Sequence, residues 1–481
     1  MKSLKILFLS AEVQPFAKTG GLADVGGSLP KALRALGHDV RVVMPAYSTV
    51  EARRASLTML PNVSVPVGTY PQPAGVFEGR LPESDVPIYF IAERNLFDRS
   101  QLYGYGDDAY RFAFFSRAAL AFAEQIEWKP DVVHAHDWHT APAVMWLDTG
   151  GRGSDFWRDT PSVFTIHNLA HQGRTDWGVL AYLRLESYRL NEEGYGEINW
   201  MARAIHHATL INTVSPTYAR EILTPEGGAG LDGLLRYRQF DVHGILNGLD
   251  DDEWNPVTDA RIPQRFDVEQ ISQRAANKRV LQQRAGLPVR DDIPLVAMVT
   301  RLDWQKGLDI TGHVLHLLLN EYAGAAQFVA LGTGDPRYEQ MLAHLAGYHR
   351  NKMAAFLSYQ ADLSHLIYAG SDMFVMPSLF EPCGLGQLIA MRYGCVPVVR
   401  ATGGLADTVQ DGVTGFSFYN YDSQSFWQAL QRALHVYRND HASWWQIQRN
   451  GMLADFSWER SALGYQQLYS WGMARFGKSG D

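Results

Sequence analysis

Short apolar runs with high β-propensity alternate with helical stretches along this chain of 481 residues. The alternation predicts an α/β fold built from parallel units, because a chain must cross over between one parallel strand and the next. We expect strands over residues 5–10, 40–44, 87–91, 131–135, 162–166, 210–214 and 242–245 in the first half, and over 294–299, 327–331, 354–357, 373–376 and 395–399 in the second.

The length suits two or three domains better than one. A turn-rich stretch, Asn247 to Asp250, separates the two groups of expected strands. We therefore expect two Rossmann-like domains with sheets of similar size that face each other across a deep cleft. Sheets of this kind bind ligands at the carboxyl ends of their strands, so the loops after the strands are the candidate site.

The hexapeptide TGGLAD occurs twice, over Thr19–Asp24 and over Thr402–Asp407. In each copy a Gly-Gly pair leads into a helix-compatible stretch. There the glycines let backbone N–H groups approach an anion, which the helix dipole favours. Lys18 precedes the first copy and adds a cation for a phosphate, and Asp24 adds an acceptor for a hydroxyl. The sequence predicts two phosphate-facing loops, one in each domain, with a plain turn before a helix as the alternative.

Composition excludes several classes of protein. The net charge of −8 argues against nucleic acid as a partner, because phosphate-backbone binding rests on Lys and Arg. The two cysteines, Cys383 and Cys395, fit a reducing compartment better than a disulfide scaffold. The apolar start imitates a signal peptide but stops at Glu12 with no cleavage-like ending. A buried first strand is therefore the better interpretation, and no run approaches the length of a membrane span. We expect a cytoplasmic protein.

Polar side chains follow two expected strands of the first domain. Asp137 comes after strand 131–135 and is expected to accept a substrate hydroxyl. His134 and His136 share one face of that strand, so a metal pair is the alternative, although no Cys or Glu nearby completes a ligand set. His167 follows the next strand, where a satisfied core histidine and a residue of the cleft are both open.

Two further groups follow strands of the second domain. Arg301 and Lys306 lie in the loop after strand 294–299, where two cations can clamp a diphosphate and stabilise its charge as it leaves. A solvated basic loop is the alternative. Glu381 is followed by Pro-Cys-Gly between an apolar strand and a helix, which places a carboxylate and exposed amides near the chemistry. Cys383 lacks a motif partner for nucleophilic catalysis and is expected to support the loop.

Three motif matches are rejected. Gly472–Ser479 fits the P-loop expression, but no strand precedes it and no room for a helix follows. Gly104–Ala109 resembles a dinucleotide fingerprint, but polar residues stand where its strand should be. The acids Asp250–Asp252 lie at the expected hinge and are interpreted as a solvated turn.

Together the motifs resemble the glycogen/starch synthase family of retaining glycosyltransferases. The resemblance implies a GT-B fold and transfer of glucose from a nucleotide donor, usually ADP-glucose in bacteria, to the non-reducing 4-hydroxyl of an α-1,4-glucan, with release of ADP. It implies a nucleotide sugar and glycogen or malto-oligosaccharide as the partners, with no metal or other cofactor. It covers nearly the whole chain, through Lys18–Asp24, His134–His139, His167–Gly173, Thr213–Arg220, Asn247–Asp250, Arg301–Gly307, Glu381–Gly384 and Thr402–Asp407.

The same resemblance assigns roles to domains and residues. Residues 1–247 form the acceptor-side domain with the Lys-Thr-Gly-Gly loop, residues 248–458 bind the nucleotide-sugar donor, and residues 459–481 form a helical tail that packs back on the first domain. The catalytic residues it implies are Glu381, Arg301, Lys306, His167 and Asp137. The donor-binding residues it implies are Lys18, Gly20, Gly21, Asp24, Cys383, Gly384, Leu385, Thr402, Gly403 and Gly404.

The chain departs from the family pattern at three positions. Leu379 stands where Arg is frequent and Gly386 where Thr is frequent, which puts donor contacts there in question. Ile389 stands where related retaining transferases carry a second Glu, as is typical of bacterial and plant synthases. The competing hypotheses are a transferase that makes a small disaccharide or maltose phosphate, a sugar-nucleotide sensor without catalysis and, as the weakest, a dehydrogenase. No residue is an obvious nucleophile, which favours front-face attack over a glycosyl-enzyme.

Overall fold

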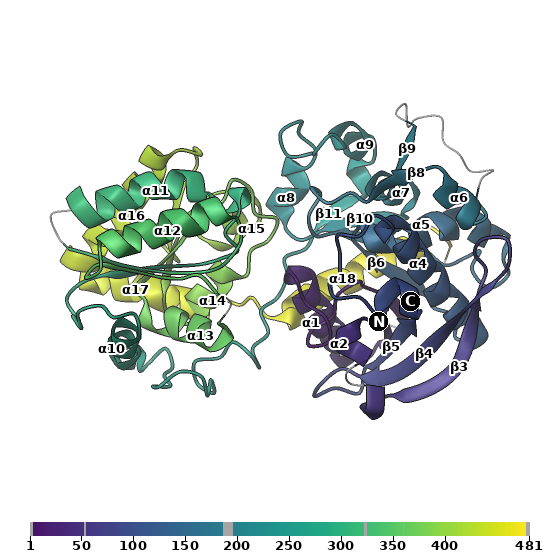
Figure 1. The fold of residues 1–481 in the computed structure, drawn as a ribbon, viewed down its shortest axis with the longest axis horizontal. Helices are drawn as coiled ribbons and strands as arrows, with labels where there is room; N and C mark the ends of the chain where they lie inside the picture. Colours follow the sequence, from purple (N-terminus) through teal and green to yellow (C-terminus); the bar gives the residue numbers. More distant parts are fainter. Residues whose placement is uncertain (1–2, 52–53, 186–195, 322–324, 359, 478–481) are drawn as a thin grey trace. The chain divides into compact units, whose positions relative to one another are not determined.

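A computed structural model describes residues 3–51, 54–185, 196–321, 325–358 and 360–477 of the chain. The chain divides into two compact units, shown in Figure 1. Unit 1 comprises Met1–Gly248 together with Trp458–Asp481, and unit 2 comprises Leu249–Ser457. Helix α18 (Trp458–Ala474) therefore returns the end of the chain to unit 1, where it packs beside α1 (Gly21–Ala35).

The sheet of unit 1 runs in the order β11-β10-β7-β6-β1-β2-β5-β4-β3. The seven strands from β11 to β5 are parallel, while β4 and β3 continue the sheet as antiparallel strands. A second small sheet pairs β8 with β9. The strands are β1 (Lys5–Leu9), β2 (Asp39–Pro45), β3 (Thr58–Val65), β4 (Gln72–Arg80), β5 (Pro87–Ala92), β6 (Val132–His136), β7 (Ser162–Ile166), β8 (Arg174–Asp176), β9 (Glu197–Asn199), β10 (Leu210–Thr213) and β11 (Val242–Gly244).

Helices cover both faces of this sheet. Helix α18 packs against β6 and β7 from one side, and α4 and α5 pack against the strands from the other. Beyond α1 and α18, the helices of unit 1 are α2 (Ser48–Glu51), α3 (Arg94–Phe97), α4 (Asp108–Gln125), α5 (Ala141–Asp148), α6 (Gly178–Tyr182), α7 (Trp200–His207), α8 (Pro216–Glu221) and α9 (Asp232–Tyr237), with 3₁₀ turns η1 (Arg54–Ser56), η2 (Trp138–Thr140), η3 (Gly150–Gly153) and η5 (Gln239–Asp241).

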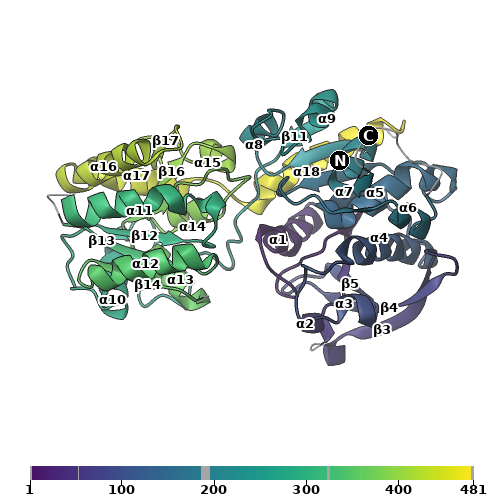
Figure 2. The ribbon, with the colours of Figure 1, turned by 45° about the horizontal axis from the view of Figure 1, so that its top comes forward.

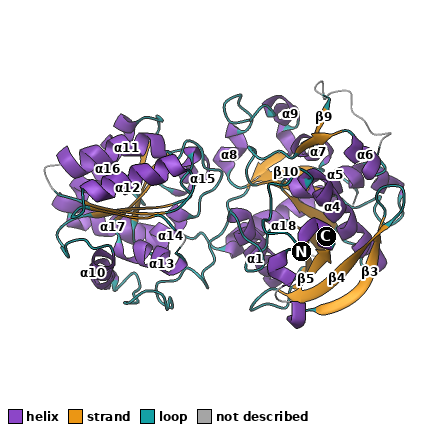
Figure 3. Cartoon of the chain, viewed as in Figure 1, coloured by secondary structure: helices purple, strands orange, loops and turns teal. Residues whose placement is uncertain are grey.

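The sheet of unit 2 is parallel throughout, in the order β14-β13-β12-β15-β16-β17, and lies between helices in Figures 2 and 3. Its strands are β12 (Leu295–Val299), β13 (Gln327–Leu331), β14 (Met353–Phe356), β15 (Met373–Met376), β16 (Val396–Arg400) and β17 (Phe416–Phe418). Its helices are α10 (Arg274–Arg284), α11 (Leu308–His316), α12 (Pro336–Tyr348), α13 (Ala361–Gly370), α14 (Gly386–Arg392), α15 (Gly403–Thr408), α16 (Ser423–Asn439) and α17 (His441–Leu453). They are accompanied by the 3₁₀ turns η6 (Ile271–Gln273) and η7 (Trp304–Lys306) and by the π-helical segment η8 (Leu317–Glu321).

Alternation along β12 shows how both faces of this sheet are buried. Leu295 and Ala297 belong to the apolar core that includes residues of α10, α13 and α14. Val296 and Met298 belong to the core that includes residues of α11, α12 and α16. Because successive side chains point to opposite faces, a strand covered on both sides must be apolar at every position, as β12 is.

Each strand expected from the sequence corresponds to an observed strand within one or two residues. The expectation of two sheets of similar size was wrong. Within the described residues the main sheet of unit 1 has nine strands and that of unit 2 has six. The additional strands β3 and β4 form an antiparallel hairpin, a connection that needs no crossover helix and so escapes a search for alternating units.

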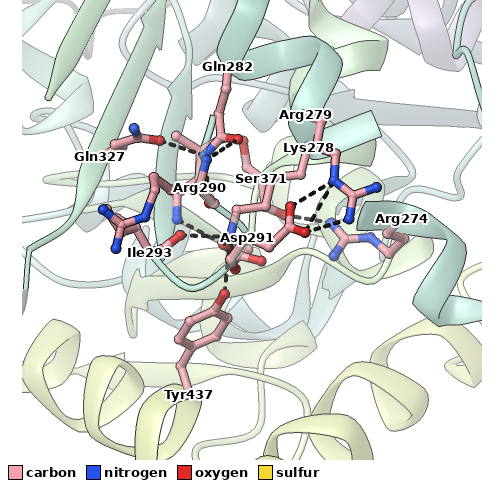
Figure 4. A network of polar contacts seen from close by, with 12 residues as sticks. Arg274, Lys278, Arg279, Gln282, Arg290, Asp291, Ile293, Gln327, Ser371 and Tyr437 are labelled. Carbon is pink, nitrogen blue, oxygen red and sulfur yellow. Dashed lines mark hydrogen bonds and ion pairs between the residues drawn. The ribbon is translucent and has the colours of Figure 1, made fainter. Parts of the chain in front are cut away.

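A buried polar network joins the layers of unit 2 (Figure 4). Lys278 of α10 contacts Asp372 with 2.7 Å between Nζ and Oδ2, and also donates to the carbonyl of Ile293 and to the hydroxyl of Tyr437. Arg274, one turn earlier, donates to the carbonyl of Ser371 at the end of α13. Because Asp372 directly precedes β15, the network links helices on both faces of the sheet to its strands.

Candidate active site

Two of the expected residues meet at the carboxyl edge of the unit 2 sheet. Lys306 ends the turn after β12, and Glu381 lies in the loop after β15, the strand beside β12. Their side chains form an ion pair, with 2.7 Å between Lys306 Nζ and Glu381 Oε2, and Ser378 donates its hydroxyl to the same oxygen at 3.1 Å. Both partners are largely buried, with 14% and 8% of their side chains exposed. The parallel sheet therefore brings a cation and a carboxylate together from loops far apart in sequence.

Close backbone packing holds these two loops. Gly307 adopts φ +71°, and a Cβ there would lie 2.1 Å from the carbonyl oxygen of Pro377. Gly403 would place a Cβ 1.9 Å from the carbonyl oxygen of Glu381, and Gly404 donates its N–H to that same oxygen. The glycines of the second TGGLAD copy thus bring the loop after β16 against the Glu381 loop, a contact that no side chain would permit.

The remaining expected residues of unit 2 lie around this pair. Arg301 lies in the same loop as Lys306. Its side chain is 61% exposed and therefore projects toward solvent, with 3.6 Å between its Nη2 and Oδ2 of Asp303. Cys383 is buried, and Leu385 precedes α14. Gln387 donates its amide to the carbonyls of Cys383 and Gly384, which fixes the loop behind Glu381.

The departure at Gly386 has a packing reason. A Cβ at this position would lie 3.0 Å from the ring of Phe374 and 3.3 Å from the sulfur of Met376. These two side chains of β15 occupy the space that a threonine would need. Leu379 donates its N–H to the carbonyl of Gln305, so its backbone also ties the Glu381 loop to the Lys306 loop.

In unit 1, Asp137 and His167 lie together at the carboxyl edge formed by β6 and β7. The carboxylate of Asp137 accepts the backbone N–H of His167 at 2.7 Å, and the His167 ring lies 2.9 Å from His136, measured between Nε2 and Nδ1. Asp137 adopts φ +56° and ψ 176°, a backbone conformation that residues other than glycine rarely adopt. A residue held in such a conformation at a sheet edge is typical of functional sites.

Burial changes the proton affinity of both groups. It raises the pKa of Asp137 to about 7, with the charge of Glu12 adding a smaller contribution and backbone N–H groups opposing it. Burial lowers the pKa of His167 to about 3, so its ring is neutral at physiological pH. The pair therefore offers a neutral imidazole beside a carboxyl group that titrates near neutrality.

The raised pKa of Asp137 predicts a pH-dependent stability. Between the ordinary value near 3.8 and about 7, the unfolded chain has released a proton that the folded protein still holds, so stability falls as pH rises through this window. Asp137→Asn removes the titration and keeps a residue type that tolerates positive φ. The buried neutral His167 has the opposite pH dependence. We therefore expect the change in the thermal unfolding midpoint from pH 5 to pH 8, taken with its sign, to be more positive in the variant than in the unchanged protein. An equal pH dependence in both proteins would contradict the raised pKa.

For the metal alternative at His134 and His136, the structure shows ring nitrogens that contact other side chains. Both ring nitrogens of His134 are occupied, Nε2 by the hydroxyl of Thr165 at 2.7 Å and Nδ1 by the hydroxyl of Tyr469 at 2.8 Å. His136 uses Nδ1 for His167. Within the part of the chain that the structure describes, no group of three or more His, Cys, Asp or Glu side chains is placed to hold a metal ion.

The first TGGLAD copy differs from the second. Positions for a Cβ at Gly20 and Gly21 meet no atom within 4 Å, so the backbone is open on that side. Lys18 contacts Asp24 with 2.6 Å between Nζ and Oδ1, and also contacts Gln14 at 2.8 Å. The same hexapeptide thus gives an exposed loop in unit 1 and a packing contact in unit 2.

One polar residue of this edge was missed by the sequence search. Glu12 follows β1 and is 3% exposed, and its carboxylate lies under the loop that carries Lys18. An isolated glutamate belongs to no recognisable motif. Its position three residues after the carboxyl end of a buried central strand was the available signal.

Comparison with known proteins identifies the family. A model described as starch synthase catalytic domain matches residues 5–237, and one described as glycosyl transferases group 1 matches residues 281–447. The glycogen synthase of Moorella thermoacetica is 45% identical, and the aligned region covers 97% of this chain and 96% of the relative. The chain belongs to the glycogen/starch synthase family. The glycogen synthase of Geotalea daltonii, a second member of this family, is also 45% identical, with 99% and 100% of the two chains covered.

Solved structures place the family on the GT-B fold. The catalytic domain of starch synthase IV from Arabidopsis thaliana bound to ADP and acarbose is similar with a TM-score of 0.90, 35% identity, and 98% and 100% of the two chains covered. Sucrose-phosphate synthase from Thermosynechococcus elongatus, at a TM-score of 0.59, 18% identity, and 98% and 99% coverage, shares the fold. The family and the fold that the motifs predicted are confirmed, and the enzyme is a glycosyltransferase. In the described residues, no helix combines the length and apolar character that a membrane crossing requires.

Proposed function

We propose that the protein transfers glucose from ADP-glucose to the non-reducing 4-hydroxyl of an α-1,4-glucan, with retention of configuration and release of ADP. The observation that carries this proposal is the Lys306–Glu381 pair at the carboxyl edge of the unit 2 sheet. Support comes from relatives named glycogen synthase and from a similar structure bound to ADP and acarbose. The proposed pathway is glycogen biosynthesis.

In the proposed reaction, negative charge develops on the departing diphosphate. Lys306 and Arg301 stabilise that charge, and Glu381 touches the donor glucose while it fixes the ammonium of Lys306. Asp137 and His167 face the sugar or the acceptor. The acceptor hydroxyl attacks C1 from the side on which the diphosphate departs, and its proton passes to the departing phosphate oxygen as the bond from C1 to that oxygen breaks. This route needs no protein nucleophile, and the sequence motifs offer no obvious one.

The decisive experiment compares donors and products. We expect ADP release from ADP-glucose in the presence of glycogen, glucose incorporation into the polymer, and slower turnover of UDP-glucose. Products confined to a disaccharide or maltose phosphate would favour the small-acceptor transferase. Binding of ADP-glucose without release of ADP would favour the sensor. Faster turnover of UDP-glucose would refute the assigned donor while leaving the class of reaction intact.

The proposal requires no metal ion, since side-chain cations carry the stabilisation of the diphosphate. We expect treatment with EDTA followed by gel filtration to change kcat/KM for ADP-glucose by less than about twofold, because no charge-neutralising group is removed. Added Mg²⁺ is expected to have an equally small effect. A loss of activity on chelation that Mg²⁺ or Mn²⁺ restores would contradict this prediction.

We further propose that the protein acts in the cytoplasm on these small-molecule and polysaccharide substrates, without nucleic acid or membrane as a partner. Both cysteines are buried and neither belongs to a disulfide, which suits a reducing compartment.

A further inference from the structure

The loop that carries Lys18 is built on a buried carboxylate. Glu12 lies three residues beyond the end of β1, the strand that pairs with β6 and β2 in the middle of the parallel part of the unit 1 sheet. The residue is 3% exposed. It therefore lies at the carboxyl edge that also carries Asp137, beneath the backbone of the first TGGLAD copy.

All the acceptor positions of this carboxylate are used. Oε2 accepts the backbone N–H of Thr19 at 2.5 Å and that of Gly20 at 3.1 Å. Oε1 accepts the hydroxyls of Thr19 at 2.6 Å and of Tyr103 at 2.8 Å. A carboxylate has about four lone-pair positions, so Glu12 has none left for a substrate proton or a sugar carbon. It cannot serve as a general base or a nucleophile while these bonds persist.

These bonds determine which face of the loop is available. The N–H groups of Thr19 and Gly20 point inward to Glu12, while Gly20 and Gly21 have open space on the side where a Cβ would stand. The second turn of α1 packs closely against the same segment, because a Cβ on Gly26 would lie 2.6 Å from the carbonyl oxygen of Glu12. The buried carboxylate of Glu12 therefore binds the inner face of the loop, and the face on the Cβ side of Gly20 and Gly21 stays open.

We infer that Glu12 is a positioning residue for donor binding. It fixes the backbone from Lys18 to Gly21 so that the ammonium of Lys18 and the open glycine face are presented to the nucleotide sugar. Glu12 itself does not touch the donor. This inference rests on the proposed function, because it gives a role to one residue in binding the proposed donor.

Three substitutions separate the reach of the side chain from its charge. Glu12→Asp keeps the charge but withdraws the carboxylate from the loop by one methylene. Glu12→Gln keeps the reach, because its oxygen can accept the two N–H groups while its NH₂ donates to the two hydroxyls. Glu12→Ala removes both. Glu93→Gln is the matched control, because Glu93 accepts the N–H of Leu96 at 2.8 Å at the start of α3, a carboxylate–amide bond elsewhere in the same unit.

The readouts are the dissociation constant of ADP, measured by calorimetry, and KM for ADP-glucose. We expect Glu12→Asp and Glu12→Ala to raise both about tenfold, as the loss of one or two charge-assisted bonds predicts. Glu12→Gln is expected to change them less than threefold, and Glu93→Gln not at all. KM for glycogen should stay within twofold in every variant. Amide hydrogen exchange at Thr19 and Gly20 should accelerate in Glu12→Asp, whether or not a ligand is present.

The outcomes that overturn the inference are distinct from those that overturn the function. If Glu12→Asp folds and binds ADP within twofold of the unchanged protein, Glu12 does not position the loop. If Glu12→Gln loses affinity while Glu12→Asp keeps it, charge and not position is responsible. Should Glu12→Ala fail to fold, the other two variants decide. Failure of the unchanged protein to bind ADP or to turn over ADP-glucose contradicts the proposed function, whereas the exchange at Thr19 and Gly20 still tests what Glu12 holds.

Discussion

Replacing Lys306 by alanine is expected to lower kcat/KM for ADP-glucose about a thousandfold, because one preorganised charge opposite a leaving group is worth about 3–4 kcal/mol. The ammonium lies 2.7 Å from Glu381 and is mostly buried, so its position is fixed before the donor binds. Water entering the vacated space is a poor substitute, since its dipoles must reorganise as charge develops. Steady-state rates of ADP release with glycogen as acceptor measure the effect.

The matched control is Lys352→Ala. Lys352 lies in the same unit and donates to the backbone carbonyl of Leu319 at 2.6 Å, so the substitution removes a lysine with a specific contact but no part in the site. We expect its kcat/KM to remain within twofold of the unchanged protein. A Lys306→Ala enzyme that keeps kcat/KM within a few-fold would show that the diphosphate is stabilised elsewhere. Neutralising both partners, in Lys306→Met with Glu381→Gln, should not restore activity, since the reaction needs the cation itself.

Strands with both faces buried beneath helices were predictable from the sequence. Strands such as β12 and β13 are apolar at nearly every position because helices cover both faces, and runs of this kind stand out in a sequence. Strand β3 is largely exposed, contains Pro61 and has a register shift between Leu60 and Val63. Its pairing is decided by β4 across the hairpin and not by its own composition. That is why the hairpin, and with it the unequal size of the two sheets, was missed.

The repeated hexapeptide shows how little a motif determines without its surroundings. Both copies start a helix after a parallel strand, as the glycines predicted. In the second copy, however, the carbonyl of Glu381 lies where a side chain of Gly403 would be, and in the first copy the corresponding space beside Gly20 is open. The difference arises from neighbouring loops that are remote in sequence. No local pattern encodes it.

The sequence predicted the candidate site through the polar residues that follow the expected strands. Lys306, Glu381, Asp137 and His167 are polar side chains just beyond buried strands, and the parallel topology brings them to the carboxyl edges of their sheets. Their roles in catalysis stay predictions. Glu12 was missed because two of its four partners are backbone N–H groups, which have no signature in the sequence, and the hydroxyl of Tyr103 is remote in sequence.

The largest expected effect on stability comes from a second lysine of unit 2. Lys278 and Asp372 are also 2.7 Å apart, with 6% and 11% of their side chains exposed, but their contacts connect α10 and α16 to the start of β12 and β15. Lys278→Met leaves the carboxylate of Asp372 buried without its cation. We expect a loss of about 3–5 kcal/mol in the free energy of unfolding of unit 2.

Calorimetric unfolding and urea titration measure this loss, and both must resolve the two units, because a chain of two units need not unfold in one step. The double substitution Lys278→Met with Asp372→Asn should recover much of the stability, since replacing both charges removes the cost of burying one alone. At a temperature where the variant is folded, kcat/KM should remain near that of the unchanged protein. The two ion pairs have equal lengths but lead to opposite predictions. Neutralising Asp372 is expected to recover the stability that Lys278→Met loses, whereas neutralising Glu381 is not expected to recover the activity lost on replacing Lys306. A Lys278→Met protein as stable as the unchanged one would show that the carboxyl group of Asp372 is protonated or hydrated in the folded unit.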